Sequence, residues 1–475
     1  MEHSGEDTIC AIATPLGEGG VGIVRVSGER AIAISTKVVQ PRNHATLEQL
    51  TSHRLYLSDV HSENTLKGSD SFPLDEALVV VMKKPRSYTG EDVVEIQTHG
   101  GPLILQSTCE ALIQQGARMA EPGEFTKRAF LNGRLDLTQA EAVLDTIQAT
   151  TSSSLRTAQS LLRGTLRREV ERLKEELLTN LAHLEAGMDF VEEDISFIQT
   201  AQLERVLQNA HSELQQLIET FEEGRIVREG IKAAIIGHPN VGKSSLLNAL
   251  LKMDRAIVSP DPGTTRDVID ESVNIAGIHM RLLDTAGLRH TEDFVEEEGI
   301  RRTKEALEEA DLILFMIDGS VELSEEDRTL LHDHATGRCL IVINKNDLPN
   351  QVETADILAI VRREEKEGHQ LQVVRISAKN EEGLDTLKET IRSLFFKSNF
   401  EPGQAPIVTH LRHKAALAQA QESISQAQGS IKAGMDAECI ALDMRAALDS
   451  LGEITGAIST EDILDRIFRD FCIGK

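Results

Sequence analysis

The sequence predicts a multidomain protein with α/β and all-α parts: an N-terminal α/β domain, a discontinuous helical bundle, and a second α/β domain inserted into that bundle. Its 475 residues are too many for a single hydrophobic core. Short β-like runs separated by Gly and Pro turns fill the first 120 residues. No proline occurs between Gly123 and His238 or after Pro406, and both stretches have helical periodicity. The expected domains are residues 1–120, 121–228, 229–395 and 396–475.

The formal net charge of −27 argues against a protein that holds nucleic acid through a diffuse positive surface. Trp is absent and aromatic residues make up only 3% of the chain, so a platform that stacks single-stranded bases is not expected. A local basic patch is compatible with this composition, although a solvated helix face explains the same residues. The candidates for the patch are Arg156, Arg163, Arg167, Arg168, Arg172 and Lys174.

The five cysteines are widely spaced and form no C-x-x-C pair, which weighs against a zinc knuckle or a disulfide framework. No apolar run reaches the roughly 18 residues of a membrane span, and the first residues lack the pattern of a signal peptide. We therefore expect a cytoplasmic protein with no membrane partner.

The N-terminal region has the pattern of a small α/β domain. Runs 21–26, 77–82 and 93–96 have the composition of strands, and residues 102–115 have helical periodicity. In the later stretches, apolar residues recur at i, i+3 and i+4, with charged residues on the opposite face. This pattern predicts helices over about 138–150, 155–188 and 201–222, and again within 408–470.

A glycine-rich loop near the middle of the chain is the most informative motif. Gly237–Ser244 fits G-x-x-x-x-G-K-[ST], whose backbone N–H groups surround the phosphates of a nucleoside triphosphate. A strand-like run, 231–236, precedes it and a helix-like run, 245–251, follows it, which is the context that the motif requires. The residues expected to bind the phosphates are Asn240, Val241, Gly242, Lys243, Ser244 and Ser245.

Four shorter motifs follow in the order of a guanine-nucleotide site: Gly263–Asp267, Asp284–Gly287, Asn344–Asp347 and Ser377–Lys379. A Thr hydroxyl of the first can reach Mg²⁺, and Asp284 can hold the ion through water. Asp347 can accept hydrogen bonds from N1–H and the exocyclic amine of guanine, which adenine cannot supply. The inserted domain therefore resembles the Ras-like, translation-factor class of P-loop GTPases. Its further GTP-binding residues would be Thr264, Thr265, Asp284, Thr285, Ala286, Gly287, Asn344, Lys345, Asp347, Ser377, Ala378 and Lys379.

Two positions depart from Ras. Leu288 stands where Ras-type enzymes place a glutamine that orients the attacking water, so another polar group must do this. The acidic run 292–298 is the nearest supplier, although a charge run at a helix start is also favoured by the helix dipole alone. Asn240 could ligate a monovalent cation beside the phosphates, or it could simply stabilise the loop.

Both ends of the chain resemble the MnmE (TrmE) family of tRNA modification GTPases. The motifs that carry this resemblance are Asp7–Pro15, Gly19–Gly28, Tyr88–Glu95, His99–Pro102, Pro122–Gly133 and Phe471–Lys475. The resemblance covers the whole chain and implies that the N-terminal domain binds a tetrahydrofolate derivative, 5-formyl- or methylene-tetrahydrofolate, and mediates constitutive dimerisation. The implied folate-binding residues are Arg25, Glu95, Arg134 and Lys475. Lys also occurs in the family at the position of Arg134, which keeps the charge but changes the geometry.

The resemblance also implies that two nucleotide domains meet face to face around K⁺ and thereby become active. Lys243 and Glu296 would be the catalytic residues, Glu296 by orienting water, and the switch loops around Arg289 would become ordered on dimerisation. The implied K⁺ ligands are Asn240, Ser259, Asp261 and Thr264, with Ser259 also at the nucleotide, and the implied Mg²⁺ ligands are Ser244 and Thr265. Cys472 could be a nucleophile toward a one-carbon unit, or a small buried apolar residue near the chain end.

The function that the resemblance implies is a K⁺-stimulated, homodimeric GTPase that modifies C5 of the wobble uridine, position 34, of certain tRNAs. It would act with a flavin-dependent partner similar to MnmG (GidA), in a heterotetramer or larger complex, and add an aminomethyl-type group. A ribosome-assembly GTPase and a purely regulatory switch are the alternatives. The acidic balance weighs against the first of these, and folate binding would weigh against both.

Overall fold

The computed structural model of the chain describes residues 7–15, 17–43, 45–61, 72–189, 200–253, 271–283, 307–334, 339–361, 371–397 and 400–475. Two compact units make up the chain, the first from residues 1–144 and 452–475 and the second from residues 145–451. This division differs from the expected domain ranges, which stay a prediction. Among the helices of the described ranges, none combines the length and the apolar character that a membrane crossing needs.

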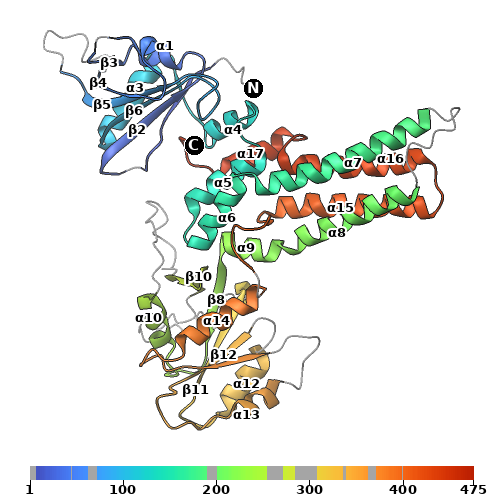
Figure 1. Ribbon diagram of the computed structural model, residues 1–475. Helices are drawn as coiled ribbons and strands as arrows, with labels where there is room; N and C mark the ends of the chain where they lie inside the picture. The colour runs from blue at the N-terminus through green and yellow to red at the C-terminus, as the bar shows by residue number, and fades with distance from the viewer. Residues whose placement is uncertain are drawn as a thin grey trace. The chain divides into compact units, whose positions relative to one another are not determined.

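The first unit contains a seven-stranded sheet with the order β3-β4-β5-β6-β2-β1-β7 (Figure 1). Neighbouring strands are antiparallel, apart from the parallel pair β1 and β7. The strand-like runs in the sequence lie within β2, β5 and β6. The strands are β1 (Ile9–Ile12), β2 (Gly19–Ser27), β3 (Val39–Pro41), β4 (Leu55–Val60), β5 (Asp75–Met82), β6 (Val93–Gly100) and β7 (Arg118–Met119).

Helices α1 (Ala31–Ser35) and α3 (Pro102–Gln114) pack on this sheet because successive strand residues point to opposite faces. In β5, Val79 and Val81 are fully buried, and they share one core with Leu105 and Leu112 of α3. Proline at the first position of α3 fits the expected start of that helix, since this position needs no backbone donor.

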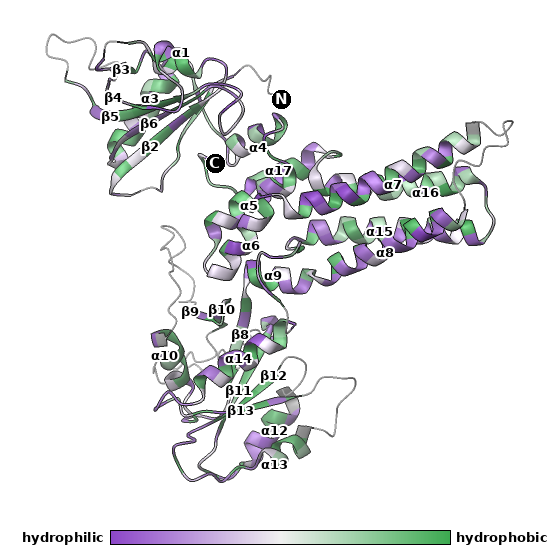
Figure 2. Cartoon of the chain, viewed as in Figure 1, coloured by the Kyte–Doolittle hydropathy of each residue, from purple (hydrophilic) through white to green (hydrophobic). Residues whose placement is uncertain are grey.

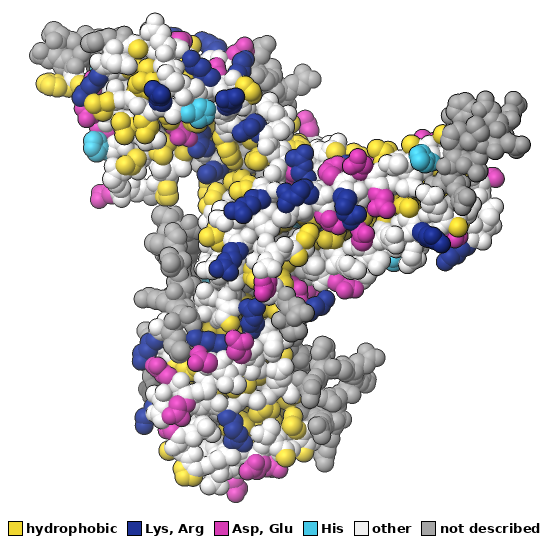
Figure 3. Space-filling model, in the orientation of Figure 1, with side chains coloured by type: hydrophobic (Ala, Val, Ile, Leu, Met, Phe, Trp, Pro, Cys, Tyr) yellow, Lys and Arg dark blue, Asp and Glu magenta, His cyan; other side chains and the backbone are white. Residues whose placement is uncertain are grey.

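The other face of the same sheet leaves apolar side chains open. Leu55 and Leu57 of β4 and Leu78 of β5 are 55%, 43% and 42% exposed, and Leu57 and Leu78 are direct partners across the two strands. In Figure 3 hydrophobic side chains gather on the surface of this domain. The domain thus has one covered and one open sheet face.

A network of buried charges holds the chain around α4 (Glu124–Leu131). Arg128 lies at its centre, with a side chain that is only 10% exposed. Its Nη2 donates to Asp7 Oδ1 at 2.6 Å and to Glu124 Oε1 at 2.9 Å, and its Nη1 lies 3.2 Å from Glu91 Oε1. Burial lowers the pKa of Arg128, but the carboxylates outweigh it, so its pKa lies above the ordinary value. The network explains why the motifs around Tyr88–Glu95 and Pro122–Gly133 contain these charges.

Replacing Arg128 with alanine is expected to destabilise the first unit by about 3 kcal/mol, since it leaves buried carboxylates without their shared cation. Tyr56 and Tyr88 are the two tyrosines of a chain without Trp, so tyrosine emission during thermal unfolding reports on this unit. Arg42→Ala is the matched control, because Arg42 pairs with Asp59 while 46% exposed and should change little. An equal response of both variants would contradict the prediction.

The C-terminal tail belongs to the first unit because two glycines permit close backbone contacts. Gly123 has φ of +68°, and a side chain there would collide with the carbonyl of Phe468 in α17 (Glu461–Arg469). Gly474 has φ of +100°, and a side chain there would collide with the carbonyl of Ile12 in β1. The last residues of the chain therefore lie against its first strand.

The second unit begins with helices. Gln421 of α15 donates to Gln215 of α8 at 2.9 Å, and Gln428 donates to Gln208 at 3.4 Å, so these two helices pack antiparallel. Arg445 of α16 pairs with Glu185 of α7 at 2.6 Å. The helices are α6 (Ser152–Leu162), α7 (Thr165–Asp189), α8 (Thr200–Glu219), α9 (Phe221–Glu229) and α15 (Leu411–Lys432); α5 (Leu137–Gln148) and α16 (Ala437–Thr455) extend across both units.

Glycines divide the longest predicted helical stretches. The expected helix 155–188 is two helices, α6 and α7, because Gly164 adopts φ of +76°. Residues 408–470 form three helices, interrupted at Gly434 and Gly456, which also have positive φ. Only glycine adopts this conformation readily, so each break follows from the residue type.

A six-stranded sheet forms the rest of the second unit, with the order β13-β12-β11-β8-β10-β9. All neighbours are parallel except β9, and β12 is buried along its whole length, as its green ribbon in Figure 2 suggests. The elements are β8 (Ile231–Ile236), α10 (Lys243–Met253), β9 (Glu271–Ile275), β10 (Ile278–Leu283), β11 (Leu312–Asp318), α12 (Glu325–His334), β12 (Cys339–Asn344), α13 (Thr354–Val361), β13 (Gln372–Arg375) and α14 (Leu384–Phe395).

Candidate functional site

The glycine-rich loop connects β8 to α10, as its flanking sequence predicts. Gly237, Asn240 and Gly242 all have positive φ, at +145°, +67° and +103°. A side chain at Gly242 would collide with the amide of Asn344, so only glycine fits there. Ser244 and Ser245 are exposed in the first turn of α10, and the free N–H groups of this turn favour an anion.

The side chain of Lys243 folds back onto the phosphate loop. Its Nζ donates to the carbonyl of Gly237 at 2.7 Å and to that of His238 at 3.2 Å. Burial lowers the pKa of this ammonium group. The cation thus lies within the curve of the loop, where the phosphates of a nucleotide would give it a stronger partner than two carbonyls.

Asn240 is exposed, and its side chain has no hydrogen bond to any described residue. Its left-handed backbone conformation is one that asparagine tolerates better than most residues. The structure thus contains a backbone reason for asparagine here, and it also leaves the side-chain carbonyl available to a cation.

Asn344 joins the phosphate loop to the segment that follows β13. Its Nδ2 donates to the carbonyl of Val241 at 2.8 Å, and its Oδ1 accepts from the N–H of Ala378 at 2.9 Å. Asn344 is 3% exposed, and Val241 and Ala378 are buried as well. Asn344 therefore holds these two loops in register, and its predicted contact with the nucleotide stays a prediction.

The side chains that would recognise the base are fixed by their neighbours. Asp347 Oδ1 accepts from Ser377 Oγ at 2.7 Å, and this hydrogen bond keeps the pKa of Asp347 below its usual value. Lys345 Nζ pairs with Asp318 Oδ2 at 2.5 Å, at the carboxyl end of β11. Asp347 and Lys379 are both exposed. An ionised, exposed carboxylate in a fixed position fits the N1–H and amine edge of guanine.

The sequence analysis did not predict Asp318 as a residue of the site. The feature that could have identified Asp318 is its position as the first charged residue after the apolar run 312–317. It lies at the carboxyl end of β11, the edge at which a parallel sheet binds ligands. Other predicted residues lie outside the described ranges: Ser259, Asp261, Thr264, Thr265, Asp284, Thr285, Ala286, Gly287, Leu288, Arg289 and Glu296.

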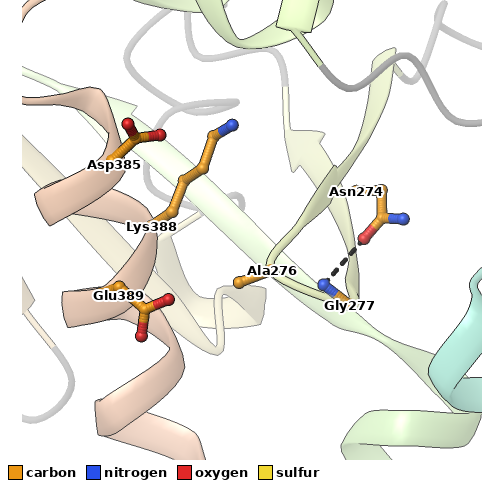
Figure 4. A pocket seen from close by; sticks show the side chains of 6 residues that line it. All are labelled: Asn274, Ala276, Gly277, Asp385, Lys388 and Glu389. Carbon is orange, nitrogen blue, oxygen red and sulfur yellow. Dashed lines mark hydrogen bonds between the residues drawn. The ribbon is translucent and has the colours of Figure 1, made fainter.

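A cavity of about 330 Å³ lies elsewhere on the same sheet, between the β9–β10 turn and α14 (Figure 4). Its lining residues are Asn274, Ala276, Gly277, Asp385, Lys388 and Glu389. Asn274 accepts from the N–H of Gly277 at 3.0 Å and shapes the turn. None of the predicted nucleotide-binding residues lines this cavity, so it is separate from the phosphate loop.

In the first unit, three of the four residues implied for folate lie together. Arg25 Nε donates to Glu95 Oε1 at 2.9 Å, and Arg25 Nη1 donates to the carbonyl of Gly474 at 3.3 Å. The ammonium group of Lys475 lies 6.0 Å from the ring centre of Tyr88, and the guanidinium of Arg25 lies 5.5 Å from it. Burial, followed by the charge of Arg25, lowers the pKa of Lys475.

Arg134 is exposed, and its Nε donates to the carbonyl of Ser87 at 3.1 Å, beside Tyr88. Tyr88, whose hydroxyl lies 2.9 Å from Thr126 Oγ1, belongs to the motif Tyr88–Glu95 but not to the residues that the resemblance implies for folate. Cys472 is exposed, so the alternative of a small buried residue is wrong. The carbonyl of Cys472 accepts from the N–H of Lys475 at 3.2 Å, in the turn that places the lysine.

The nearly parallel sheet, the phosphate loop at the end of β8 and the Asn344 bridge define a P-loop guanine-nucleotide-binding protein. Two family models match the chain: "MnmE helical domain" over residues 137–472 and "GTP-binding protein TrmE N-terminus" over residues 8–134. The chain belongs to the MnmE family of tRNA modification GTPases, and it is a GTP hydrolase.

Full-length relatives agree with this assignment. The tRNA modification GTPase MnmE of Natranaerobius thermophilus is 45% identical over 99% of this chain and 100% of the relative. That of Geobacter sulfurreducens is 45% identical over 99% of both chains, and that of Clostridioides difficile is 42% identical over 99% of both. Among solved structures, Era of Aquifex aeolicus bound to GDP and AlF4⁻ is 31% identical over 41% of this chain and 66% of that chain, with a TM-score of 0.27.

Proposed function

We propose that this chain is a K⁺-stimulated GTPase that, with a flavin-dependent partner, modifies C5 of the wobble uridine of certain tRNAs with a one-carbon unit from tetrahydrofolate. The observation that carries the proposal is that one chain of this family combines two separate sites. One is the guanine-nucleotide site around Lys243 and Asp347, and the other is the cluster of Arg25, Glu95 and Lys475 in the first unit.

The second site suits a folate in its chemistry. Glu95 offers a carboxylate to the donor edge of a pterin, Tyr88 offers an aromatic face, and Lys475 and Arg134 offer cations to the glutamate tail. The folate supplies the one-carbon unit when bound. The protein's own part is to hold the pterin against Glu95, and the exposed Cys472, whose carbonyl accepts from the N–H of Lys475, is the candidate nucleophile.

At the nucleotide site, Lys243 and the loop N–H groups would hold the β- and γ-phosphates, and Ser244 with Thr265 would hold Mg²⁺. Glu296 would orient the attacking water, because Leu288 cannot. Asn240 would ligate K⁺ together with Ser259, Asp261 and Thr264. The free side chain of Asn240 supports its part in this set.

We also propose that residues 229–395 are a nucleotide domain inserted into a helical domain formed by residues 121–228 and 396–475. The antiparallel packing of α8 on α15, which flank the insertion, supports this arrangement. A homodimer is supported by the open apolar face around Leu55, Leu57 and Leu78. The flavin-dependent partner would complete a heterotetramer or larger complex in the cytoplasm, where the tRNA is found.

Mass analysis of wobble uridine tests the function directly. Deleting the gene for this chain should remove the modified nucleoside, and restoring the chain should return it. Unchanged wobble uridine in the deletion strain would refute the proposal. Folate binding has its own readout: 5-formyltetrahydrofolate should quench Tyr88 emission in the wild-type chain and much less in Glu95→Gln.

Replacing Asn240 with alanine is expected to abolish the stimulation of GTP hydrolysis by K⁺ over Na⁺, because it removes a cation ligand beside the developing charge. Steady-state rates at matched ionic strength provide the measurement. His238→Ala is the control, since the ring of this exposed neighbour contacts the carbonyl of Pro239 and the carboxylate of Glu326, while Lys243 donates to its backbone carbonyl, which alanine keeps. Full K⁺ stimulation in Asn240→Ala would remove the cation site from the mechanism.

A further inference from the structure

One segment of this acidic protein has a purely positive charge. Residues 146–168 contain Arg156, Arg163, Arg167 and Arg168 and neither Asp nor Glu, although the whole chain has a formal charge of −27. The segment forms α6 and the first residues of α7. All four arginines are exposed.

The turn at Gly164 brings the arginines of the two helices together. Arg168 Nη1 donates to the carbonyl of Arg163 at 2.7 Å, so the first turn of α7 folds back on the end of α6. Arg156 and Arg163 are seven residues apart, which places them on one face of α6, about 10 Å apart along its axis. The same face contains the uncharged residues Ser152 and Gln159.

The residues of the predicted basic patch fall into two groups, according to whether a carboxylate pairs with them. Arg172 pairs with Glu169, Glu176 and Glu213, and Lys174 pairs with Glu171. In contrast, no carboxylate of the described residues pairs with Arg156, Arg163 or Arg168. We call these three residues the arginine patch. In Figure 3, Lys and Arg side chains gather where Figure 1 places α6 and the start of α7.

We propose that the arginine patch binds the phosphate backbone of an RNA duplex, which under the proposed function is a stem of the tRNA. Guanidinium groups match phosphate oxygens through paired hydrogen bonds, and those without a carboxylate partner break no ion pair on binding. The separation of Arg156 and Arg163 along α6 lets the two side chains contact different phosphates of one duplex. Since the surrounding protein is acidic and repels RNA, the patch would also orient the tRNA on the chain.

Binding of an unmodified tRNA transcript to the full chain tests this proposal. The variant Arg156→Gln/Arg163→Gln/Arg168→Gln should bind at least about tenfold more weakly at about 0.1 M salt. Its plot of log affinity against log salt should be shallower by about 2 to 3, close to one for each lost phosphate contact. The matched control is Arg172→Gln/Lys174→Gln on the same helix, which should bind within about twofold of wild type. GTP hydrolysis without RNA should be unchanged in both.

Several outcomes would overturn the proposal. Wild-type affinity and salt dependence in the triple variant would do so, as would an equal loss in the control or absence of salt-dependent RNA binding by the wild-type chain. Loss of binding to the flavin-dependent partner with intact RNA binding would make the patch a protein interface instead. The wobble-uridine assay on the deletion strain decides the proposed function separately, so either idea can fail without the other.

Discussion

Replacing Asp347 with asparagine is expected to lower the affinity for GTP by about 100-fold and to create affinity for xanthosine triphosphate. The carboxylate would accept from both N1–H and the exocyclic amine of guanine, whereas an asparagine amide has one acceptor and would turn an N–H₂ group toward that amine. Xanthine has a carbonyl oxygen in place of the amine and suits the amide. Because Asp347 is exposed and its side chain is held by a hydrogen bond from Ser377 Oγ, the fold should be unaffected.

Displacement of a fluorescent GDP analogue by each triphosphate measures both affinities. Ser377→Ala is the control, because it removes the hydroxyl that holds the carboxylate and leaves the carboxylate in place. It should weaken GTP binding by no more than about tenfold and should give no xanthosine triphosphate binding. If Asp347→Asn bound GTP as tightly as wild type, Asp347 would have no part in base recognition.

The residues around the phosphate loop show how much of the site can be predicted from the sequence. The strand-like run 231–236 is β8 with the predicted bounds, since a short apolar run with clear flanks identifies a buried strand well. Asn344 was assigned to the nucleotide because the motif alone gives its proximity. Its bridge to Val241 and Ala378 depends on contacts 103 and 34 residues away in sequence, which no local pattern contains.

The helical stretches show a second limit of prediction from the sequence. Apolar spacing predicted one helix over 155–188, because Gly164 interrupts the pattern without changing its period. Glycine permits the left-handed conformation of Gly164, but glycine within a helical pattern does not by itself predict a break. At the C-terminus, the family resemblance already grouped Lys475 with Arg25 and Glu95, and the structure adds the close packing at Gly123 and Gly474 that makes this possible.

Asp145 was missed altogether, and it is the most deeply buried carboxylate that joins distant parts of the second unit. Its Oδ1 accepts from Arg228 Nε at 2.8 Å, and its Oδ2 lies 3.0 Å from His410 Nε2. Its side chain is 7% exposed. Arg228 lies in the last turn of α9, just before β8, and His410 is the N-cap of α15, which follows the sheet, so one carboxylate holds both connections between the sheet and the helices.

Replacing Asp145 with asparagine is therefore expected to destabilise both connections by about 3 kcal/mol. The half-buried cation of Arg228 loses its counter-ion, and the new N–H₂ group turns toward Arg228 or His410. Hydrogen exchange of the amides at the end of α9 and the start of α15 measures this locally, which avoids treating a multidomain chain as two-state. Arg445→Ala is the control, because its pair with Glu185 joins side chains that are 58% and 36% exposed and should change exchange little. Equal exchange in wild type and Asp145→Asn would contradict the prediction.

The pH dependence of the same hydrogen exchange distinguishes the effect of the charge of Asp145 from the effect of the shape of its carboxyl group. Burial raises the pKa of Asp145, but the hydrogen bond and charge of His410, followed by the charge of Arg228, outweigh it, so its pKa lies below the ordinary carboxyl value. A carboxyl whose pKa is lower in the folded state stabilises that state fully above its unfolded pKa of about 3.9, and this contribution is lost as the pH falls through the folded value. The difference in opening free energy between wild type and Asp145→Asn should thus shrink as the pH falls below about 4. A difference that persists unchanged at about pH 3 would mean that the shape of the carboxyl group, and not its charge, holds Arg228 and His410.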